Sequence, residues 1–336
     1  MLPAKTPISF EKARFIKYSL SRSLIMTTAF RRVGSLAVIK TKKSNGIIEK
    51  GIAVIGSTAI DKIVQRNSSC FKIGGVTTYS GITYRRHGIN TCVVTNVANC
   101  DREIIRRLRQ ESIVVNNGQT QFTTFFKNMI DDEGKRSQKI LQQAASINRE
   151  QVNKNLKEVD FVHLGPLYPT DIDAPAIELI DRLKHFVILD VQGLVRAVRN
   201  NTVYTAVSEH LPAALRVSHV VKANRQEYES LIAFFRTDLL GLMRQFHIHE
   251  FVVTAGHKGG FVQTIRAGKI SYPAARVTSN GDPTGAGDVF LAAYIIGRFS
   301  KKRSIADACK YAAKLAARQI EGKYIKPNDL CLEDPK

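Results

Sequence analysis

The fold is decided by Ser279-Asn280-Gly281-Asp282-Pro283-Thr284-Gly285-Ala286-Gly287-Asp288-Val289-Phe290, which lies in a chain of 336 residues. Two glycines flank Ala286, a carboxylate follows, and an apolar run continues to residue 296, which is typical of a loop that opens into a helix. Such a loop leaves backbone N–H groups unpaired at the positive end of a helix, where they attract an anion such as phosphate. Because Asp288 would repel phosphate, we interpret it as a base beside the anion site, a geometry suited to phosphoryl transfer to an alcohol.

A purely structural interpretation of the same stretch is a turn and N-cap ahead of a buried helix. Asp288 would then only be stabilised by the helix dipole. For an isolated Gly-x-Gly, that interpretation would be the better one. The full string is more specific, which favours the phosphate interpretation.

The run from Asp282 to Asp288 resembles, at every signature position, the Asp/Asn-x-Thr-Gly-Ala-Gly-Asp loop of the ribokinase-like (phosphofructokinase B) sugar kinases. The resemblance extends over roughly residues 51–325. It implies a three-layer α/β/α sandwich with a mostly parallel central sheet and a small β lid. It also implies that the catalytic residues are Asp288 as the base and Gly285, Ala286 and Gly287 as the loop that holds the transferring phosphate, with Thr284 beside ATP.

Composition favours a soluble globular protein without a membrane segment. The hydrophobic content of 44% can form a sizeable core, and no apolar run approaches the roughly 18 residues that span a bilayer. The cysteines are scattered without a Cys-x-x-Cys pair, which favours reduced thiols in a cytoplasmic protein; they are Cys70, Cys92, Cys100, Cys309 and Cys331.

The net charge of +21 raises the question of nucleic-acid binding. Residues 1–50 hold 11 Lys and Arg against two acids, so they carry +9 of that charge. No helix-turn-helix, zinc-finger or aromatic RNA-binding pattern accompanies it, so we expect small-molecule substrates and no nucleic acid. We predict that residues 1–50 form a basic, flexible extension; a transit peptide, and thus organellar targeting, or an over-long translation start are the alternatives.

Substrate contacts are expected near the start of the globular region, which begins with a buried strand at 51–57. The spacing from Gly56-Ser57 to Asp61 resembles the family motif whose Asp holds substrate hydroxyls; a solvated loop Asp is the alternative. Gly74-Gly75 before a helix is another family feature, which brings the backbone close to the sugar. Simple furanose kinases usually have Asn four residues later, where this chain has Tyr79, as a substrate contact or as plain helix packing.

Strands near 62–73 and a hairpin-like pattern over 121–142 correspond to the family lid, which excludes water from the site. Strands at 161–166 and 186–190, with a helix over 171–184 between them, continue a β-α-β rhythm. The run Asp190-x-Gln192-x-x-x-Arg196 looks like the version found in inositol kinases, which implies Gln192 and Arg196 as substrate contacts. We interpret His163 as a core histidine.

Metal and nucleotide contacts are expected toward the C-terminal half. Asn224-x-x-Glu227 resembles the family motif that organises Mg²⁺ around the phosphates, because side chains at i and i+3 share one helix face. An N-cap with a capping-box Glu is the structural alternative. Residues 251–260 resemble the Thr-x-Gly-x-x-Gly segment along ATP, which implies contacts from Thr254, Gly256 and Gly259. Residues 305–320 are predicted to form a packing helix.

These patterns together predict a kinase domain over 51–330 that uses ATP and Mg²⁺ to phosphorylate a hydroxyl of a small sugar or polyol, inositol-like substrates included. The resemblance also allows a monovalent cation, and either a monomer or a homodimer. A nucleoside kinase is the alternative on the same fold, with Tyr79 or Phe122 stacked on the base. An alternative from another class is a non-catalytic kinase-like protein that binds partners or nucleic acid.

Overall fold

The computed structural model describes residues 48–65, 68–131, 136–278 and 281–333. The predicted N-terminal extension therefore lies outside the described residues except for 48–50. Ser279 and Asn280 of the signature stretch, and residues 132–134 of the predicted hairpin turn, also lie outside them. Within the described ranges, no helix has the length and apolar character needed to cross a membrane.

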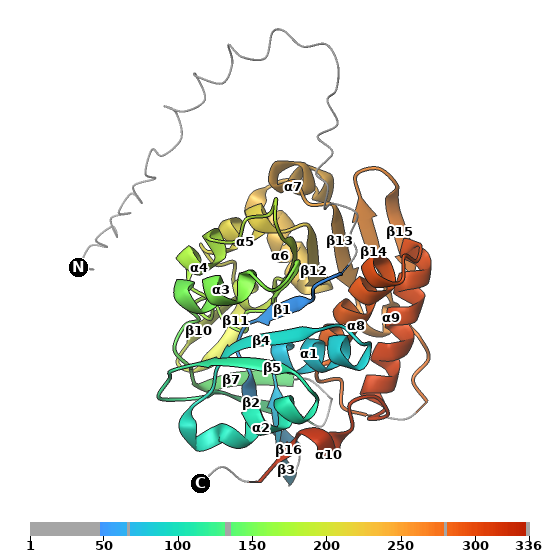
Figure 1. The fold of residues 1–336 in the computed structure, drawn as a ribbon. Helices are drawn as coiled ribbons and strands as arrows, with labels where there is room; N and C mark the ends of the chain where they lie inside the picture. Colours follow the sequence, from blue (N-terminus) through green and yellow to red (C-terminus); the bar gives the residue numbers. More distant parts are fainter. Residues whose placement is uncertain (1–47, 66–67, 132–135, 279–280, 334–336) are drawn as a thin grey trace, which may run out of the picture. The chain divides into compact units, whose positions relative to one another are not determined.

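A large sheet of nine strands forms the centre of the described chain (Figure 1). From β5 to β13 neighbouring strands pair in parallel, and β13, β14 and β15 pair antiparallel. In sheet order the strands are β15 (Gly268–Tyr272), β14 (Gly260–Thr264), β13 (Glu250–Thr254), β12 (Val220–Asn224), β9 (Phe186–Asp190), β8 (Phe161–Leu164), β1 (Ile52–Ile55), β4 (Thr91–Asn96) and β5 (Val114–Gly118).

Helices cover both faces of this sheet, which makes a three-layer α/β/α arrangement. Every residue of β1 is buried because helices lie on both sides of it. Side chains alternate along the strand, so Ile52 and Val54 join one core, and Ala53 and Ile55 join the other. The first core is closed by α1 (Val76–Arg86), α2 (Arg102–Gln110), α8 (Ala286–Ile295) and α9 (Ile305–Ile320), and the second by α3 (Arg149–Leu156), α4 (Ala174–Glu178), α5 (Leu211–Val217), α6 (Arg225–Phe235) and α7 (Leu239–Phe246).

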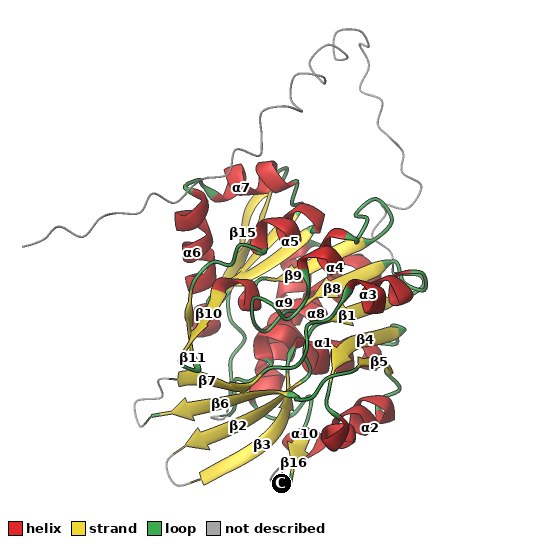
Figure 2. Cartoon of the chain, turned by 90° about the vertical axis from the view of Figure 1, so that its left-hand side faces the viewer, coloured by secondary structure: helices red, strands yellow, loops and turns green. Residues whose placement is uncertain are grey.

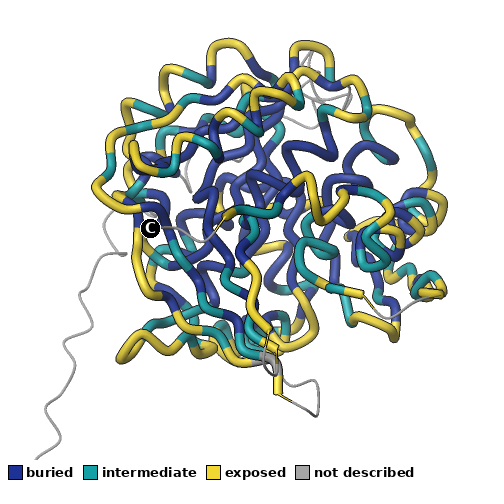
Figure 3. Tube along the Cα trace, turned by 90° about the horizontal axis from the view of Figure 1, so that it is seen from below, coloured by how far each residue is buried: buried dark blue, intermediate teal, exposed yellow. Residues whose placement is uncertain are grey.

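The distribution of buried and exposed residues agrees with the three-layer arrangement. Viewed from below, buried segments gather in the middle of the molecule and exposed segments form its rim (Figure 3). The helical elements of the described ranges are completed by short helical turns at Asn99–Asp101, Gln192–Val195 and Gly256–Lys258, a π-helical turn at Ile296–Ser300, and the short helix α10 (Pro327–Leu330). The predicted fold class is therefore confirmed.

The predicted helix over 171–184 is wrong in length, because only Ala174–Glu178 is helical. Asp171 is fully buried, and its carboxylate accepts hydrogen bonds from the N–H groups of Leu167 at 2.7 Å and Ser57 at 3.1 Å. A carboxylate that accepts a hydrogen bond from the backbone N–H four residues earlier in the chain stabilises a turn instead of a helix. The short helix then begins at Ala174, with Pro175 in its first turn.

A second sheet of seven strands lies beside the large one (Figure 2). The strands near 62–73 and 121–142 belong to it, while three further strands were not predicted. Only β2 and β6 pair in parallel in this sheet, as far as its described strands show. In sheet order the strands are β10 (Arg196–Arg199), β11 (Thr202–Thr205), β7 (Arg136–Gln142), β6 (Thr124–Ile130), β2 (Ala59–Gln65), β3 (Ser68–Gly74) and β16 (Cys331–Leu332).

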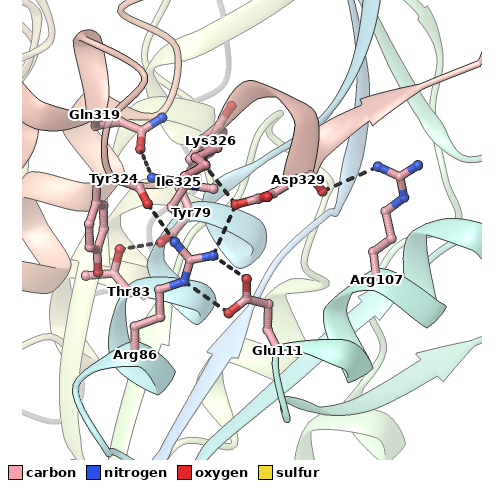
Figure 4. A network of polar contacts seen from close by, with 10 residues as sticks. All are labelled: Tyr79, Thr83, Arg86, Arg107, Glu111, Gln319, Tyr324, Ile325, Lys326 and Asp329. Carbon is pink, nitrogen blue, oxygen red and sulfur yellow. Dashed lines mark hydrogen bonds and ion pairs between the residues drawn. The ribbon is translucent and has the colours of Figure 1, made fainter.

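The C-terminal segment is anchored to α1 and α2 by a network around Arg86 (Figure 4). The Arg86 guanidinium donates to the Glu111 carboxylate, to the backbone oxygen of Tyr324 at 2.6 Å and to Asp329 at 3.3 Å. Arg107 on α2 donates to the backbone oxygen of Asp329 at 3.4 Å. These bonds fix α10 (Pro327–Leu330), from which β16 continues to the edge of the second sheet.

Candidate active site

The signature loop opens directly into α8, as its sequence predicts. Gly285 precedes the helix with a left-handed φ of +76°, and no side chain caps the first turn. The N–H of Ala286 donates to the backbone oxygen of Pro283 at 3.1 Å. The N–H groups of Gly285, Gly287 and Asp288 are the ones that the turn offers to an anion. Gly285 lies against Tyr79 of α1 so closely that a Cβ atom at position 285 would be 2.3 Å from the tyrosine ring. Only glycine satisfies both the backbone angle and this contact.

Asp288 lies in the first turn of α8, beside this loop. Its Oδ1 atom is 3.5 Å from Nε2 of Gln192, and its backbone oxygen accepts from the Ser80 hydroxyl at 3.2 Å. Burial, and next the charge of Asp190, raise the pKa of Asp288 to about 7, while Lys222 opposes the rise. A carboxylate with such a pKa can exchange a proton near neutral pH, as a general base must.

A buried ion pair lies beneath the loop. Nζ of Lys222 on β12 is 2.9 Å from Oδ2 of Asp190 at the end of β9, and the two side chains are 6% and 0% exposed. The same Nζ is 3.4 Å from where a Cβ atom at Gly287 would lie. The ammonium group therefore lies next to residues 285–288, which we call the anion loop. Burial would lower the pKa of Lys222, but the charges of Asp190, Glu227 and Asp288 together outweigh it and raise the pKa, so the lysine keeps its charge.

Sequence reasoning gave Lys222 no role. The available signal was a lysine between the apolar residues Val221 and Ala223 of a buried strand, since a charge is rarely buried without a partner. Its partner Asp190 lies 32 residues earlier and meets it because β9 and β12 are neighbours. Lys222 therefore joins the candidate site as an addition from the structure.

Asp61 is held in a fixed position on β2. The side chain is buried, and Oδ1 accepts from Nδ2 of Asn128 at 3.0 Å, whose own oxygen accepts from Gln138 at 2.8 Å. A Cβ atom at Gly74 would lie 2.0 Å from Oδ2 of Asp61, so glycine at position 74 makes room for the carboxylate. Asp61 also contributes to the raised pKa of Asp288, which places the two carboxylates within electrostatic reach of one another.

Gly75 and Tyr79 have close structural contacts of their own. Gly75 has φ +93°, and a Cβ atom there would be 2.4 Å from the backbone oxygen of Ser57 at the end of β1. The Tyr79 side chain is 2% exposed and belongs to the core that contains α8. These contacts pack the start of α1 between β1 and the anion loop.

Gln192 and Arg196 follow β9 in the chain and lie near Asp288. Arg196 donates to Oε1 of Gln192 at 3.3 Å and to the backbone oxygen of Leu167 at 3.0 Å. The charge of Arg196 also lowers the pKa of Asp288. These two predicted substrate residues are therefore brought to the predicted base.

Asn224 and Glu227 form a capping box at the start of α6, the structural arrangement that their spacing allowed. Oδ1 of Asn224 accepts from the Glu227 N–H at 2.9 Å, and Oε2 of Glu227 accepts from the Asn224 N–H at 2.7 Å. Burial is the main cause that raises the pKa of Glu227. Their assignment to Mg²⁺ stays a prediction.

The predicted ATP residues lie at the carboxyl end of β13, in the turn that follows it, and before α8. Thr254 ends β13 and is in register with Asn224 at the end of β12. Gly256 has open space at its Cβ position, whereas Gly259 lies against the backbone oxygen of Tyr272. Thr284 precedes the anion loop and donates to Asp282. The carboxyl ends of parallel strands are the usual ligand-binding edge of such sheets.

His163 is buried in β8 with Nδ1 3.1 Å from the hydroxyl oxygen of Tyr84. Burial lowers its pKa to about 4, so the imidazole is neutral at physiological pH. No hydrogen bond from the described residues joins it to Asp288.

Comparison with solved structures gives the ribokinase fold. One similar structure is a pyrophosphate-dependent kinase of the ribokinase family complexed with a pyrophosphate analogue and myo-inositol; it is 23% identical, with a TM-score of 0.70 over 83% of this chain and 98% of that one. A nucleoside kinase from Methanocaldococcus jannaschii is 19% identical, with a TM-score of 0.66 over 84% and 95% of the two chains. Ribokinase from Thermotoga maritima is 18% identical, with a TM-score of 0.64 over 84% and 96%.

None of the curated proteins compared with the chain matches it. The sequence profile of the pfkB family carbohydrate kinases matches residues 53–326. That match contains the anion loop, Asp288, Asp61 and the Lys222–Asp190 pair. The chain therefore belongs to the pfkB family of carbohydrate kinases.

Proposed function

We propose that this kinase transfers the terminal phosphoryl group of ATP to a hydroxyl of a small sugar or polyol, with an inositol-like ring among the candidate acceptors. The observation that carries the proposal is the position of Asp288: a carboxylate with a pKa near 7 in the first turn of a helix whose N-terminus is open to an anion. Phosphoryl transfer needs both features at one place, since a base and an anion site must meet at the reacting hydroxyl.

In the proposed mechanism, Asp61 orients acceptor hydroxyls, and Asp288 takes the proton of the attacking hydroxyl. The new bond forms between that oxygen and the terminal phosphorus of ATP, the bond to the bridging oxygen breaks, and ADP leaves. The N–H groups of Gly285, Gly287 and Asp288, together with the nearby charge of Lys222, stabilise the negative charge of the transferring group. Most of the rate enhancement then comes from positioning and electrostatics.

Asn224 and Glu227 would hold Mg²⁺ through water molecules, next to the phosphates of the donor. Among the described residues there is no cluster of three or more His, Cys, Asp or Glu that could bind a metal by itself. A buried Glu whose Oε2 is used in the capping box keeps a second carboxylate oxygen, which suits an ion that retains several waters. Bound Mg²⁺ supplies charge neutralisation on the phosphates.

One of the two residues expected to stack on a nucleoside base is buried. The Tyr79 side chain is 2% exposed and lies against Gly285, so its ring has no open face for a base. Phe122, with 43% of its surface exposed, is the remaining candidate. A nucleoside acceptor would therefore depend on Phe122.

The proposal is tested with a matrix of acceptors and donors. The acceptors are myo-inositol, a set of hexoses and pentoses, and nucleosides; the donors are ATP and pyrophosphate, because a similar structure is that of a pyrophosphate-dependent kinase. Product formation is followed by ³¹P NMR, which detects a new phosphate monoester whichever donor is consumed. We expect acceptor-dependent phosphorylation of a polyol or sugar with ATP and Mg²⁺.

Three other results would change the assignment. Turnover with pyrophosphate but not ATP would overturn the donor. Turnover of nucleosides alone, abolished by Phe122→Ala, would overturn the acceptor class. No turnover with any pair, together with salt-sensitive binding of RNA or DNA, would favour the non-catalytic alternative.

A further inference from the structure

Lys72 connects the second sheet to the anion loop. Its Nζ atom lies 2.9 Å from Oδ2 of Asp282, and the two side chains are 13% and 32% exposed. Strand pairing places Lys72 on β3 directly opposite Asp61 on β2. Opposite residues of an antiparallel pair project from the same face of a sheet. The lysine that reaches the loop and the carboxylate that we assign to the acceptor therefore leave one face of the sheet side by side.

Asp282 uses its other oxygen to shape the loop. Oδ1 accepts from the N–H of Thr284 at 2.9 Å and from its hydroxyl at 2.5 Å, one residue before Gly285 begins the anion loop. Burial would raise the pKa of Asp282, but hydrogen bonds from Thr284 and Lys72 outweigh it and lower the pKa. The carboxylate thus stays ionised at neutral pH and binds the sheet and the loop at the same time.

The sheet end of this connection is fixed on both sides. On one side β3 pairs with β2, where Asn128 holds Asp61. On the other side β3 pairs with β16, where Cys331 lies opposite Lys72. A strand that is paired on both edges holds the backbone of Lys72 in place. The ammonium group of Lys72 therefore sets the position of Asp282 through their ion pair.

We propose that Lys72 is a positioning residue of the proposed kinase reaction: its ion pair with Asp282 sets the anion loop relative to Asp61, so that acceptor hydroxyl and transferring phosphoryl group are aligned together. This inference rests on the proposed function. Alignment of the reacting groups is a large component of such catalysis, and a misplacement of about 1 Å can cost about a hundredfold in rate.

The kinetic test compares Lys72→Met with Lys62→Met. Lys62 is the matched control because it projects from the opposite face of the sheet, since it follows Asp61 on β2. On that face its Nζ lies 4.8 Å from the centre of the Phe71 ring. We expect Lys72→Met to lower kcat about tenfold with the acceptor KM changed less than about threefold. Lys72→Arg should retain at least half of the activity, and Lys62→Met should match the parent protein.

A double-mutant cycle shows whether Lys72 acts through Asp282. If it does, Asp282→Asn lowers kcat to a similar extent, and the double variant Lys72→Met/Asp282→Asn is no slower than the worse single variant. Losses that multiply would contradict the inference, because they would mean that the two residues act independently.

Hydrogen exchange separates this inference from the kinase proposal. In Lys72→Met, peptides over 281–288 should exchange faster, since the Thr284 N–H bond to Asp282 loosens, while peptides over 305–320 report unchanged global stability. Lys62→Met should leave both unchanged. Unaltered loop exchange and unaltered kcat in Lys72→Met would overturn the inference. A parent protein without kinase activity, whose loop exchange still responds to Lys72→Met, would overturn the proposed function and leave the connection between sheet and loop standing.

Discussion

At the scale of single residues, the chemistry of Asp288 depends on the charges around it. Asp190 and Asp61 raise its pKa, and Lys222 and Arg196 lower it, but burial is the largest cause of the shift to about 7. The signature string predicted the base. The pKa of Asp288 could not be predicted, because the four charged neighbours come from distant parts of the chain, on β2, β9, β10 and β12, and meet only in the folded protein.

The raised pKa of Asp288 predicts the pH dependence of turnover. A base acts only when deprotonated, so kcat/KM should fall about tenfold per pH unit below its pKa and level off above it, with a midpoint near 7. The measurement is kcat/KM from pH 5.5 to 9, with circular dichroism at each pH to exclude unfolding. A flat profile between pH 6 and 8 would argue against Asp288 as the base.

Lys222 is predicted to be essential for stability as well as for the site. Lys222→Met leaves the fully buried Asp190 without its partner, so the free energy of unfolding should fall by about 3–5 kcal/mol. Urea unfolding measures this loss. Lys184→Met is the control, because the Lys184–Asp181 pair is 76% and 41% exposed and should be nearly neutral. Equal unfolding midpoints for the two variants would contradict the proposed importance of the buried pair.

At the scale of elements, the anion loop depends on how α8 begins against α1. Gly285 combines a positive φ with contact to the Tyr79 ring. Gly268, the first residue of β15, has a similar φ of +70° with nothing within 4 Å of its Cβ position. The two glycines therefore separate the cost of the backbone angle from the cost of the contact.

We expect Gly285→Ala to be more harmful than Gly268→Ala. In Gly268→Ala only the left-handed backbone is penalised, by about 1–2 kcal/mol. In Gly285→Ala the added methyl group also displaces the loop or the Tyr79 ring, so kinase activity should be lost as well. Unfolding midpoints and kcat are the measurements. Gly285→Ala with normal kcat would show that the loop tolerates displacement.

Element boundaries were predictable where hydrophobic periodicity is strong. The helix Ile305–Ile320 and the strand Phe186–Asp190 agree with prediction at both ends. The helix over 171–184 failed because the buried Asp171 carboxylate binds backbone N–H groups, a tertiary contact that periodicity does not report. The strands β10, β11 and β16 were missed because their residues are exposed or half-buried, so they lack the apolar run that marks the equally short buried strands β1 and β8.

At the scale of the whole molecule, the C-terminal segment of the described chain is bound to α1 and α2. Arg86 joins α1 to Glu111 and Asp329, and α1 in turn carries Tyr79 beneath the anion loop. No local pattern in residues 321–333 predicts this contact, since it depends on side chains more than 200 positions earlier. The resemblance to a family predicted the topology, but not how this chain anchors its end.

We expect Arg86→Met to lower the Tm by about 2–4 °C, the shift for a loss of about 1 kcal/mol in a domain of this size. The reason is that Glu111 and Asp329 would lose their shared donor. Arg106→Met on α2 is the matched control, because Arg106 bonds only to Glu103 on the same exposed helix face, as far as the described residues show. Equal Tm values for the two variants would contradict an anchoring role for Arg86.

The most direct measurement of the central claim, that Asp288 is the general base of a phosphoryl transfer, is turnover by Asp288→Asn with donor affinity determined in parallel. We expect kcat to fall by at least about a hundredfold while the donor Kd stays within about threefold, because the backbone donors of the loop remain. Asp307→Asn, in the first turn of α9, is the control and should keep the parent kcat. Near-normal turnover by Asp288→Asn would contradict the account.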